Sequence, residues 1–412
     1  MNEKKLAHVA MDENNPSWEE MTKREKPLYS RPDDVRNPFA RDYTRVLHSL
    51  AYRRLKHKTQ VFFNAAGNDH ICTRIEHVAH VDSVSSTIAE HLGLNEKLTK
   101  AIALSHDLGH APFGHEGETI INELTMKYLG ERFWHEKNGV YFVDKIELLE
   151  DNEKKLRNLD LTYAVRDGII SHCGEVDQNG IKPRPKNIPF SEIKKAGQYQ
   201  AATWEGCVVK LADKIAYLGR DIEDAIRLGY LNREQQECLK EMAKINNEKA
   251  INTTVIMHNM IIDLCENSSE EKGLSLSDTM SQQLKDVKDF NIKYIYQNKR
   301  MQPARRYSKL VIQEIFEQLC SYYKGSDTIF YLDTIHYDYK NFVKTFAEWL
   351  VRYCENDYTN LTWAKEISDR CINEKIYGTL ERENDYIRAV IDFVAGMTDV
   401  YAIKAFNELL EC

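Results

Sequence analysis

From residue 106 to residue 118 the chain reads His-Asp-Leu-Gly-His-Ala-Pro-Phe-Gly-His-Glu-Gly-Glu. Three imidazoles and three carboxylates therefore surround a short Gly/Pro break. The adjacent His106 and Asp107 can bind one metal ion, and His110 follows one helical turn later. His115 and Glu118 are three residues apart, so they share a face of any helix that resumes after the break. This set of side chains suits metal-assisted chemistry on a phosphate better than it suits a hydrophobic core.

The composition is that of an ordinary soluble globular protein. The chain has 412 residues, of which 29% are charged and 42% hydrophobic, and its mean hydropathy is −0.56. This length allows one large core or two domains. No run of about 18 apolar residues occurs, so we predict no membrane span. The N-terminus lacks the apolar segment of a signal peptide, and the nine cysteines form no C-x-x-C pair, so we expect a cytoplasmic protein with reduced thiols.

The charge is negative overall but uneven. A net charge of −8 argues against a wholly basic nucleic-acid binder. Between Lys23 and Lys58, however, eleven Lys and Arg residues accompany four acidic ones. This segment could face phosphates, or it could be a solvated helix face with ion pairs, and the sequence supports both interpretations equally.

Apolar residues recur at helical spacing along most of the chain, so we predict an all-α fold. Helices are expected over residues 41–55, 74–92, 98–108 and 204–228. We divide the chain into an N-terminal extension (residues 1–28), a helical catalytic core (29–230) and a helical C-terminal region (231–412) that completes the pocket and the oligomer contacts. The Gly- and Pro-containing loop between residues 172 and 204 could be a lid or an oligomer contact.

Four candidate metal ligands come from three separate segments: His77, His106, Asp107 and Asp213. Two imidazoles and two carboxylates suit Mn, Fe, Co, Ni, Mg or Zn and leave coordination positions open. Spacing alone cannot show that these segments meet, and an isolated His77 or Asp213 could be an unrelated polar residue. Asp213 lies among apolar residues of its helix, where a buried carboxylate needs a partner such as a cation. Tyr217 and Asp221 follow on the same helix face.

The order of these residues resembles the H…HD…D signature of the HD superfamily of metal-dependent phosphohydrolases. The resemblance is closer to the bacterial deoxyguanosine triphosphate triphosphohydrolases, and it runs from about Tyr29 to Ala402. Four stretches carry it: residues 47–61, 103–118, 211–224 and 393–399. The chain departs from the family pattern at Ala111, where Pro is usual, and at Val400, where Arg is usual. These departures leave base preference and regulation open.

The resemblance implies roles for individual residues. It implies four metal ligands: His77, His106, Asp107 and Asp213. It implies that Arg74 and His110 contact phosphate, and that His115 is the catalytic acid, oriented by Glu118. It implies three residues that read the deoxyribose: Gln60, Tyr217 and Asp221. His135 and His172 could enter the pocket or bind phosphate, but neither is assigned a role.

The implied reaction converts a deoxynucleoside triphosphate and water into a deoxynucleoside and inorganic tripolyphosphate, with dGTP as the expected preferred substrate. One divalent metal per site is expected, with Mn or Mg favoured. The resemblance further implies a homo-oligomer such as a hexamer. Single-stranded DNA or a second dNTP could act as an effector, and the sequence leaves this open. Two alternatives remain: another HD-superfamily nucleotide phosphohydrolase (a monophosphatase or phosphodiesterase), and a nucleotide- or single-stranded-DNA-sensing protein.

Overall fold

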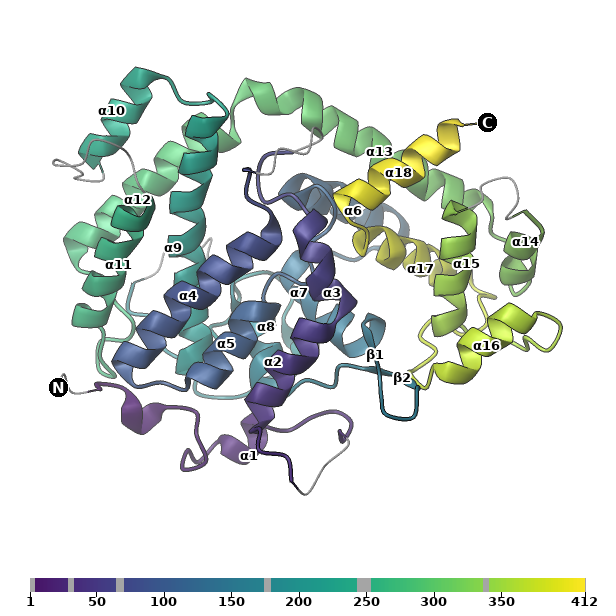
Figure 1. Cartoon of the computed structure of the whole chain (residues 1–412), viewed down its shortest axis with the longest axis horizontal. Helices are drawn as coiled ribbons and strands as arrows, with labels where there is room; N and C mark the ends of the chain where they lie inside the picture. Colours follow the sequence, from purple (N-terminus) through teal and green to yellow (C-terminus); the bar gives the residue numbers. More distant parts are fainter. Residues whose placement is uncertain are drawn as a thin grey trace. The chain divides into compact units, whose positions relative to one another are not determined.

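The computed structural model describes residues 4–28, 33–63, 70–173, 179–242, 253–335 and 341–411. Within these ranges the chain is a succession of helices, and its one sheet is a hairpin of the strands β1 (Leu148–Glu150) and β2 (Leu156–Asn158) (Figure 1). The all-α prediction is therefore confirmed. Among the described residues, no helix combines the length and the apolar character needed to cross a membrane.

The chain divides into two compact units, each built from several chain segments. Unit 1 comprises residues 1–47, 60–107 and 160–302, and unit 2 comprises residues 48–59, 108–159 and 303–412. The linear division at residues 28 and 230 stays a prediction. The unit boundary after residue 107 lies inside the His/Asp-rich stretch, so each unit carries part of it.

Unit 1 is centred on α4 (Arg74–Leu92), α5 (Glu96–Ser105) and α9 (Trp204–Arg227), which pack against one another (Figure 1). The α4 helix begins where the backbone N–H of Thr73 donates to Glu76 Oε2 (2.7 Å), and it ends at Gly93, whose φ of 86° suits glycine. The Thr203 hydroxyl caps α9 by accepting from the N–H of Gly206 (3.1 Å). The other α-helices of unit 1 are α1 (Trp18–Met21), α2 (Pro38–His48), α8 (Tyr163–Ser171), α10 (Arg233–Met242), α11 (Thr253–Asn267) and α12 (Asp278–Asn291).

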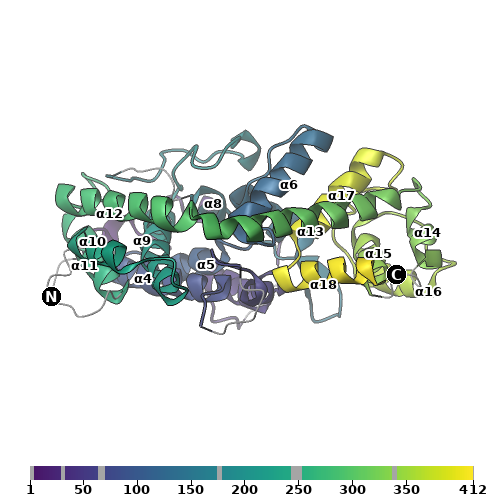
Figure 2. The ribbon, with the colours of Figure 1, turned by 90° about the horizontal axis from the view of Figure 1, so that it is seen from above.

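In unit 2, α13 (Gln302–Ser321) and α18 (Asp399–Leu410) cross in the view of Figure 1 and lie near each other in that of Figure 2. Tyr307 of α13 packs edge-on against Phe406 of α18, with ring centroids 6.4 Å apart. The α17 helix (Glu383–Ala395) packs on α6 (Gly114–Leu129). The remaining α-helices of unit 2 are α3 (Leu50–Arg54), α7 (His135–Tyr141), α14 (Thr328–Ile335), α15 (Phe342–Tyr353) and α16 (Thr362–Arg370).

Two of the four predicted helices have almost the expected bounds, and two differ. The predictions for residues 74–92 and 204–228 are confirmed by α4 and α9, whereas α5 ends at Ser105 rather than at residue 108. The predicted helix over residues 41–55 was wrong as one element, because the chain breaks at Ser49 between α2 and α3. Ser49 is extended, and Glu147 accepts the freed backbone N–H groups of Leu50 (2.7 Å) and Ala51 (3.0 Å).

Candidate functional site

The four predicted metal ligands come together in unit 1. His77 Nε2 lies 2.9 Å from Asp213 Oδ1 and 3.8 Å from Asp107 Oδ2. His106 Nε2 lies 3.4 Å from Asp107 Oδ1 and 3.9 Å from Asp213 Oδ1. Three elements supply them: α4 carries His77, the end of α5 leads into His106 and Asp107, and α9 carries Asp213. Two imidazole nitrogens and two carboxylates therefore face one small, mostly buried space.

The His106 ring is oriented as in many metal-binding histidines. Its Nδ1 lies 2.7 Å from the backbone oxygen of Ala103, so Nδ1 carries the proton and donates it to that carbonyl. The Nε2 lone pair then points into the cluster. In the described part of the chain, buried Nε2 of His106 has no hydrogen-bond partner. A cation bound here would accept this lone pair and compensate the charge of the two carboxylates, which lie within 4 Å of it.

Charges within the cluster also favour a cation. Burial alone would raise the pKa of Asp213, but the hydrogen bond and the charge of His77 hold that pKa below its usual value. Burial would likewise lower the pKa of His77, whereas the hydrogen bond and charge of Asp213, together with the charge of Asp107, raise it. The carboxylates of Asp107 and Asp213 therefore stabilise a positive charge in this cluster.

Arg74 contacts one of the candidate metal ligands and has further N–H groups that could bind an anion. Its Nη1 donates to Asp107 Oδ2 (2.7 Å), and both side chains are buried. Among the described residues, the Nε and Nη2 groups of Arg74 have no hydrogen-bond partner. A buried guanidinium with unused N–H groups is well suited to bind phosphate oxygens.

The predicted sugar-reading residues also lie in unit 1. Asp221 is buried on α9, and its Oδ2 accepts a hydrogen bond from the hydroxyl of Tyr296 (2.6 Å). Tyr296 ends a π-helical turn, Ile292–Tyr296, directly after α12. The Oε1 atom of Gln60 is buried and lacks a hydrogen-bond partner in the described ranges. Asp221 is thus a buried rather than an exposed acid, and the neighbouring Arg220 pairs with Glu223 (2.9 Å).

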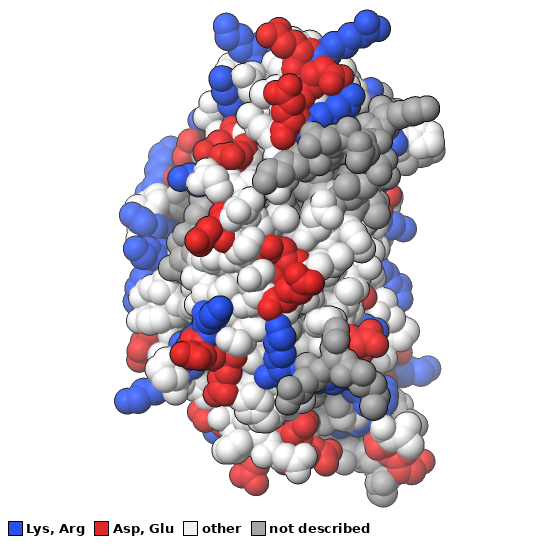
Figure 3. Space-filling view, turned by 90° about the vertical axis from the view of Figure 1, so that its left-hand side faces the viewer, with Lys and Arg blue, Asp and Glu red and all other residues white. Residues whose placement is uncertain are grey.

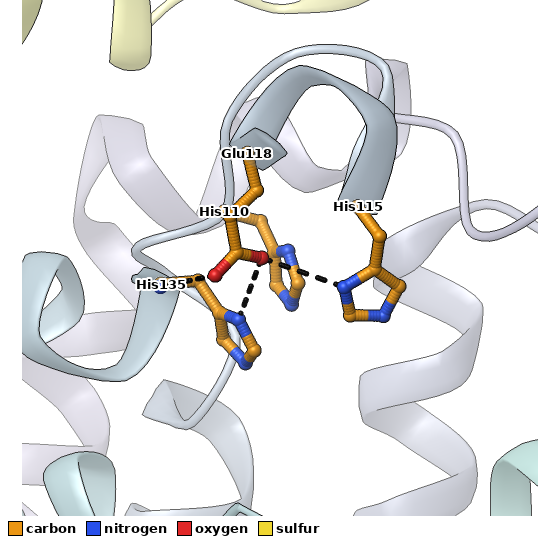
Figure 4. A group of neighbouring side chains, drawn as sticks. All are labelled: His110, His115, Glu118 and His135. Carbon is orange, nitrogen blue, oxygen red and sulfur yellow. Dashed lines mark hydrogen bonds and ion pairs between the residues drawn. The ribbon is translucent and has the colours of Figure 1, made fainter. Parts of the chain in front are cut away.

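A second cluster, His110, His115, Glu118 and His135, lies in unit 2 (Figure 4). Glu118 Oε2 lies 3.4 Å from His115 Nδ1 and 3.0 Å from His135 Nδ1. The other carboxylate oxygen, Oε1, accepts from the backbone N–H of His135 (2.9 Å). The His110 ring stacks on the His135 ring, with centroids 3.8 Å apart and planes 17° from parallel. His115 stands at the edge, with 63% of its side chain exposed.

Local backbone features hold this cluster in place. A Cβ on Gly109 would come within 2.1 Å of the backbone oxygen of His135, so only glycine allows the turn to press against α7. Phe113 precedes α6 in a left-handed conformation (φ 64°), which costs a non-glycine residue about 1 kcal/mol or more. Its N–H donates to Asp399 Oδ1 (2.8 Å), which helps to hold this backbone conformation.

The charge on Glu118 is stabilised by its neighbours. Burial alone would raise the pKa of Glu118, but the charges of His135 and His110 and the hydrogen bonds from His115 and His135 hold it far below its usual range. The carboxylate is therefore ionised at neutral pH and can orient both imidazoles.

Sequence reasoning gave no role to two histidines that the structure places at the clusters. His135 contacts Glu118, and the His172 ring lies 5.0 Å from the His106 ring in unit 1. His172 Nδ1 also lies 2.6 Å from the backbone oxygen of Ile169, which is the arrangement seen for His106. In the sequence, His135 directly follows Phe-Trp and His172 precedes Cys-Gly, and neither context separates a site histidine from a core one.

Comparison with known proteins gives the family. The sequence profile of the HD domain matches residues 74–218, and that of a phosphohydrolase-associated domain matches residues 366–408. A deoxyguanosinetriphosphate triphosphohydrolase-like protein of Caldanaerobacter subterraneus subsp. tengcongensis is 34% identical over 379 residues, which cover 91% of this chain and 86% of that protein. A protein of the same description from Clostridium perfringens (strain SM101) is 32% identical over 380 residues, covering 92% and 88%. One from Desulfatibacillum aliphaticivorans is 36% identical over 300 residues, covering 72% and 76%.

The chain belongs to the deoxyguanosinetriphosphate triphosphohydrolase-like family of HD-domain proteins. It is accordingly a phosphohydrolase of the HD type, and HD domains bind a divalent metal. The matched range of the HD domain contains all four predicted ligands. These residues fit a cation, since the buried His106 Nε2 has no hydrogen-bond partner among the described residues and two carboxylates face it.

Several arginines in the basic segment of this HD-domain protein form ion pairs. Arg24 pairs with buried Asp42, Arg41 with Asp34, and Arg54 with Glu147 (2.9 Å). These contacts agree with the interpretation of a helix face with ion pairs. On the face drawn in Figure 3, basic and acidic side chains are likewise interspersed over a largely uncharged surface.

Proposed function

We propose that this chain hydrolyses deoxynucleoside triphosphates, dGTP by preference, to the deoxynucleoside and inorganic tripolyphosphate. The observation that carries the proposal is the buried cluster of His77, His106, Asp107 and Asp213 with the unused N–H groups of Arg74 beside it. A cation-binding cluster next to a guanidinium with unused N–H groups is suited to bind a polyphosphate. The descriptions of the relatives support the same substrate class.

In this proposal, His77, His106, Asp107 and Asp213 hold one divalent cation, Mn or Mg. When bound, the cation supplies Lewis acidity toward a phosphate oxygen and toward water. Arg74 keeps Asp107 in position with one N–H and offers the others to the charge that develops on the phosphate. His110 contributes a further contact to phosphate.

The leaving 5′-oxygen needs a proton, and we assign this step to His115. Glu118 holds the Nδ1 side of that ring at 3.4 Å, so Nε2 is the atom that delivers the proton. Imidazole titrates near neutral pH, which suits a group that must give and regain a proton in each turnover. His135 contacts the same carboxylate and is a positioning residue for Glu118.

Selection for deoxyribose is assigned to Gln60, Tyr217 and Asp221. Tyr296 holds Asp221 through a 2.6 Å hydrogen bond, so the Asp221 carboxylate has one fixed orientation. A ribose 2′-hydroxyl would have to displace the Asp221 carboxylate from its hydrogen bond with Tyr296 or clash with it. Ribonucleotides are therefore expected to be poor substrates.

Product analysis tests the proposal. The purified protein is incubated with each dNTP and rNTP, with Mn²⁺ or Mg²⁺ and then with a chelator, and the products are separated by ion-exchange chromatography. Deoxynucleoside and tripolyphosphate, lost with the chelator and in Asp107→Ala and His115→Ala, would support it. Release of orthophosphate or pyrophosphate would instead indicate another HD phosphohydrolase activity.

The oligomer and effector proposals need separate measurements. We expect a homo-oligomer such as a hexamer, and sedimentation velocity measures its mass. The turnover assay is repeated with single-stranded DNA or a second dNTP added. Absence of turnover under all these conditions would favour a nucleotide- or DNA-sensing protein.

A further inference from the structure

We propose that His115, Glu118 and His135 of unit 2 form a second metal site, selective for a late divalent transition metal such as Zn²⁺. We further propose that filling this site inhibits the enzyme. The inhibitory half rests on the proposed function, in which His115 supplies a proton, whereas the binding half does not.

The ligand atoms already face one point. Nδ1 of His135 and Nδ1 of His115 lie 3.0 and 3.4 Å from the same carboxylate oxygen, Glu118 Oε2 (Figure 4). In a tetrahedral zinc site with bonds of about 2.0–2.1 Å, neighbouring ligand atoms are roughly 3.3 Å apart. Both distances to Glu118 are close to this value, so small side-chain rotations suffice to bind the ion.

The surrounding structure prepares the site. The hydrogen bond from the backbone of His135 to Oε1 leaves Oε2 for the ion, and the i,i+3 spacing puts His115 and Glu118 on one face of α6. The His110 ring is stacked nearly parallel on His135, and one of its nitrogens lies within 4.8 Å of the ligand atoms of the other three residues. The exposed side of His115 leaves the remaining coordination position to water.

The ligand set decides which metals compete. Two imidazoles and one carboxylate are borderline ligands that favour Zn²⁺ or Cu²⁺ over Mn²⁺ or Mg²⁺. Binding displaces to solvent the protons that the two Nδ1 atoms share with Glu118. A metal on Nδ1 of His115 thus replaces the contact with Glu118 that orients this ring, and the 5′-oxygen loses its proton donor.

Cobalt binding to the full-length, metal-free protein tests the binding half. Co²⁺ is titrated with equilibrium dialysis and visible absorption, because four-coordinate Co²⁺ absorbs more strongly than hydrated Co²⁺. We expect two equivalents per chain in the wild type and one in His115→Ala, whose exposed position keeps the fold intact. The matched control, His91→Ala, changes an exposed histidine of α4 and should keep both equivalents. A single equivalent in the wild type, or two in His115→Ala, would overturn the proposal.

A second variant and a turnover assay complete the test. Asp213→Asn should lose the unit 1 equivalent and keep the visible band that His115→Ala loses. In a wild-type enzyme that turns over dNTP with Mn²⁺, Zn²⁺ should inhibit at the concentration that fills the second site, and full turnover with both sites filled would overturn the inhibitory half. If no dNTP is turned over at all, the proposed function and its inhibition fail together, while the cobalt stoichiometry still decides whether the second site exists.

Discussion

The two histidine clusters use similar side chains in opposite ways. In unit 1, His106 directs its proton to a backbone carbonyl and turns an unpartnered lone pair toward two carboxylates. In unit 2, His115 and His135 both turn Nδ1 toward one carboxylate, and His115 is exposed. The first arrangement offers lone pairs to a cation, and the second holds protons that a metal ion must displace before it binds. The group that contacts Nδ1, a backbone carbonyl in one cluster and a carboxylate in the other, therefore determines the chemistry of each imidazole.

Removing a carboxylate from the unit 1 cluster is expected to have the largest effect. Asp213→Asn should lower turnover by roughly 10³-fold or more, because a bound cation contributes several kcal/mol to transition-state stabilisation. The bound metal, measured by elemental analysis, should fall in parallel. Asp82→Asn, at another half-buried aspartate of this unit, is the control. Full metal content with lost activity would contradict the assignment of Asp213 as a ligand.

Removing the His115 imidazole should distinguish the roles of the two clusters. His115→Ala should lower turnover by about 10²-fold or more, the usual contribution of a general acid, while the unit 1 metal stays bound. Steady-state kinetics and metal analysis of the same preparation measure both quantities. His91→Ala should change neither. An active His115→Ala enzyme would show that the proton comes from elsewhere.

A smaller effect is expected at Asp221, which is held by a phenol rather than by an imidazole. Tyr296→Phe removes the 2.6 Å hydrogen bond and should reduce the preference for dGTP over GTP about fivefold, since such a bond contributes about 1 kcal/mol. The ratio of kcat/KM for the two substrates measures this, and Tyr294→Phe on the same turn is the control. An unchanged ratio in Tyr296→Phe would remove Tyr296 from the site.

Asp392 in unit 2 shows what happens to a buried carboxylate without a nearby imidazole. Burial raises its pKa from 3.8 to about 6, although Arg388 and the hydroxyls of Tyr141 and Tyr377 oppose the shift. Because the folded-state pKa is raised, this group stabilises the fold at low pH, and the contribution is lost as the pH rises through about 6.

Between about pH 5 and about pH 8 the loss should be about 1 kcal/mol. Asp392→Asn keeps an acceptor for both phenols and should remove this part of the pH dependence. Urea unfolding at the two pH values measures it. If the free energy of unfolding changes equally between the two pH values in both proteins, Asp392 does not titrate in this range.

The sequence predicted the helices better than it predicted the contacts. The apolar stripes of α4 and α9 define both helices, and the ordered His77, His106, Asp107 and Asp213 indicated a metal site because their types and order match a family signature. The break at Ser49 was missed because Glu147, far along the chain, accepts the N–H groups that it frees. The contact of Tyr296 with Asp221 spans 75 residues and depends on the packing of α12 against α9, which local patterns do not encode.

Asp399 has a consequence for the order in which the protein matures. Its carboxylate accepts the N–H groups of Thr59 (2.9 Å), 340 residues away, and of Phe113 (2.8 Å), 286 residues away. At ribosomal rates of about 5–20 residues per second, roughly half a minute separates the synthesis of Thr59 from that of Asp399. The turn that leads into α6 therefore gains this anchor only after residue 399 has been synthesised. A nascent chain can form α4 and α5 earlier, whereas one that stops before residue 399 lacks this support for the backbone that precedes His115, the proposed proton donor.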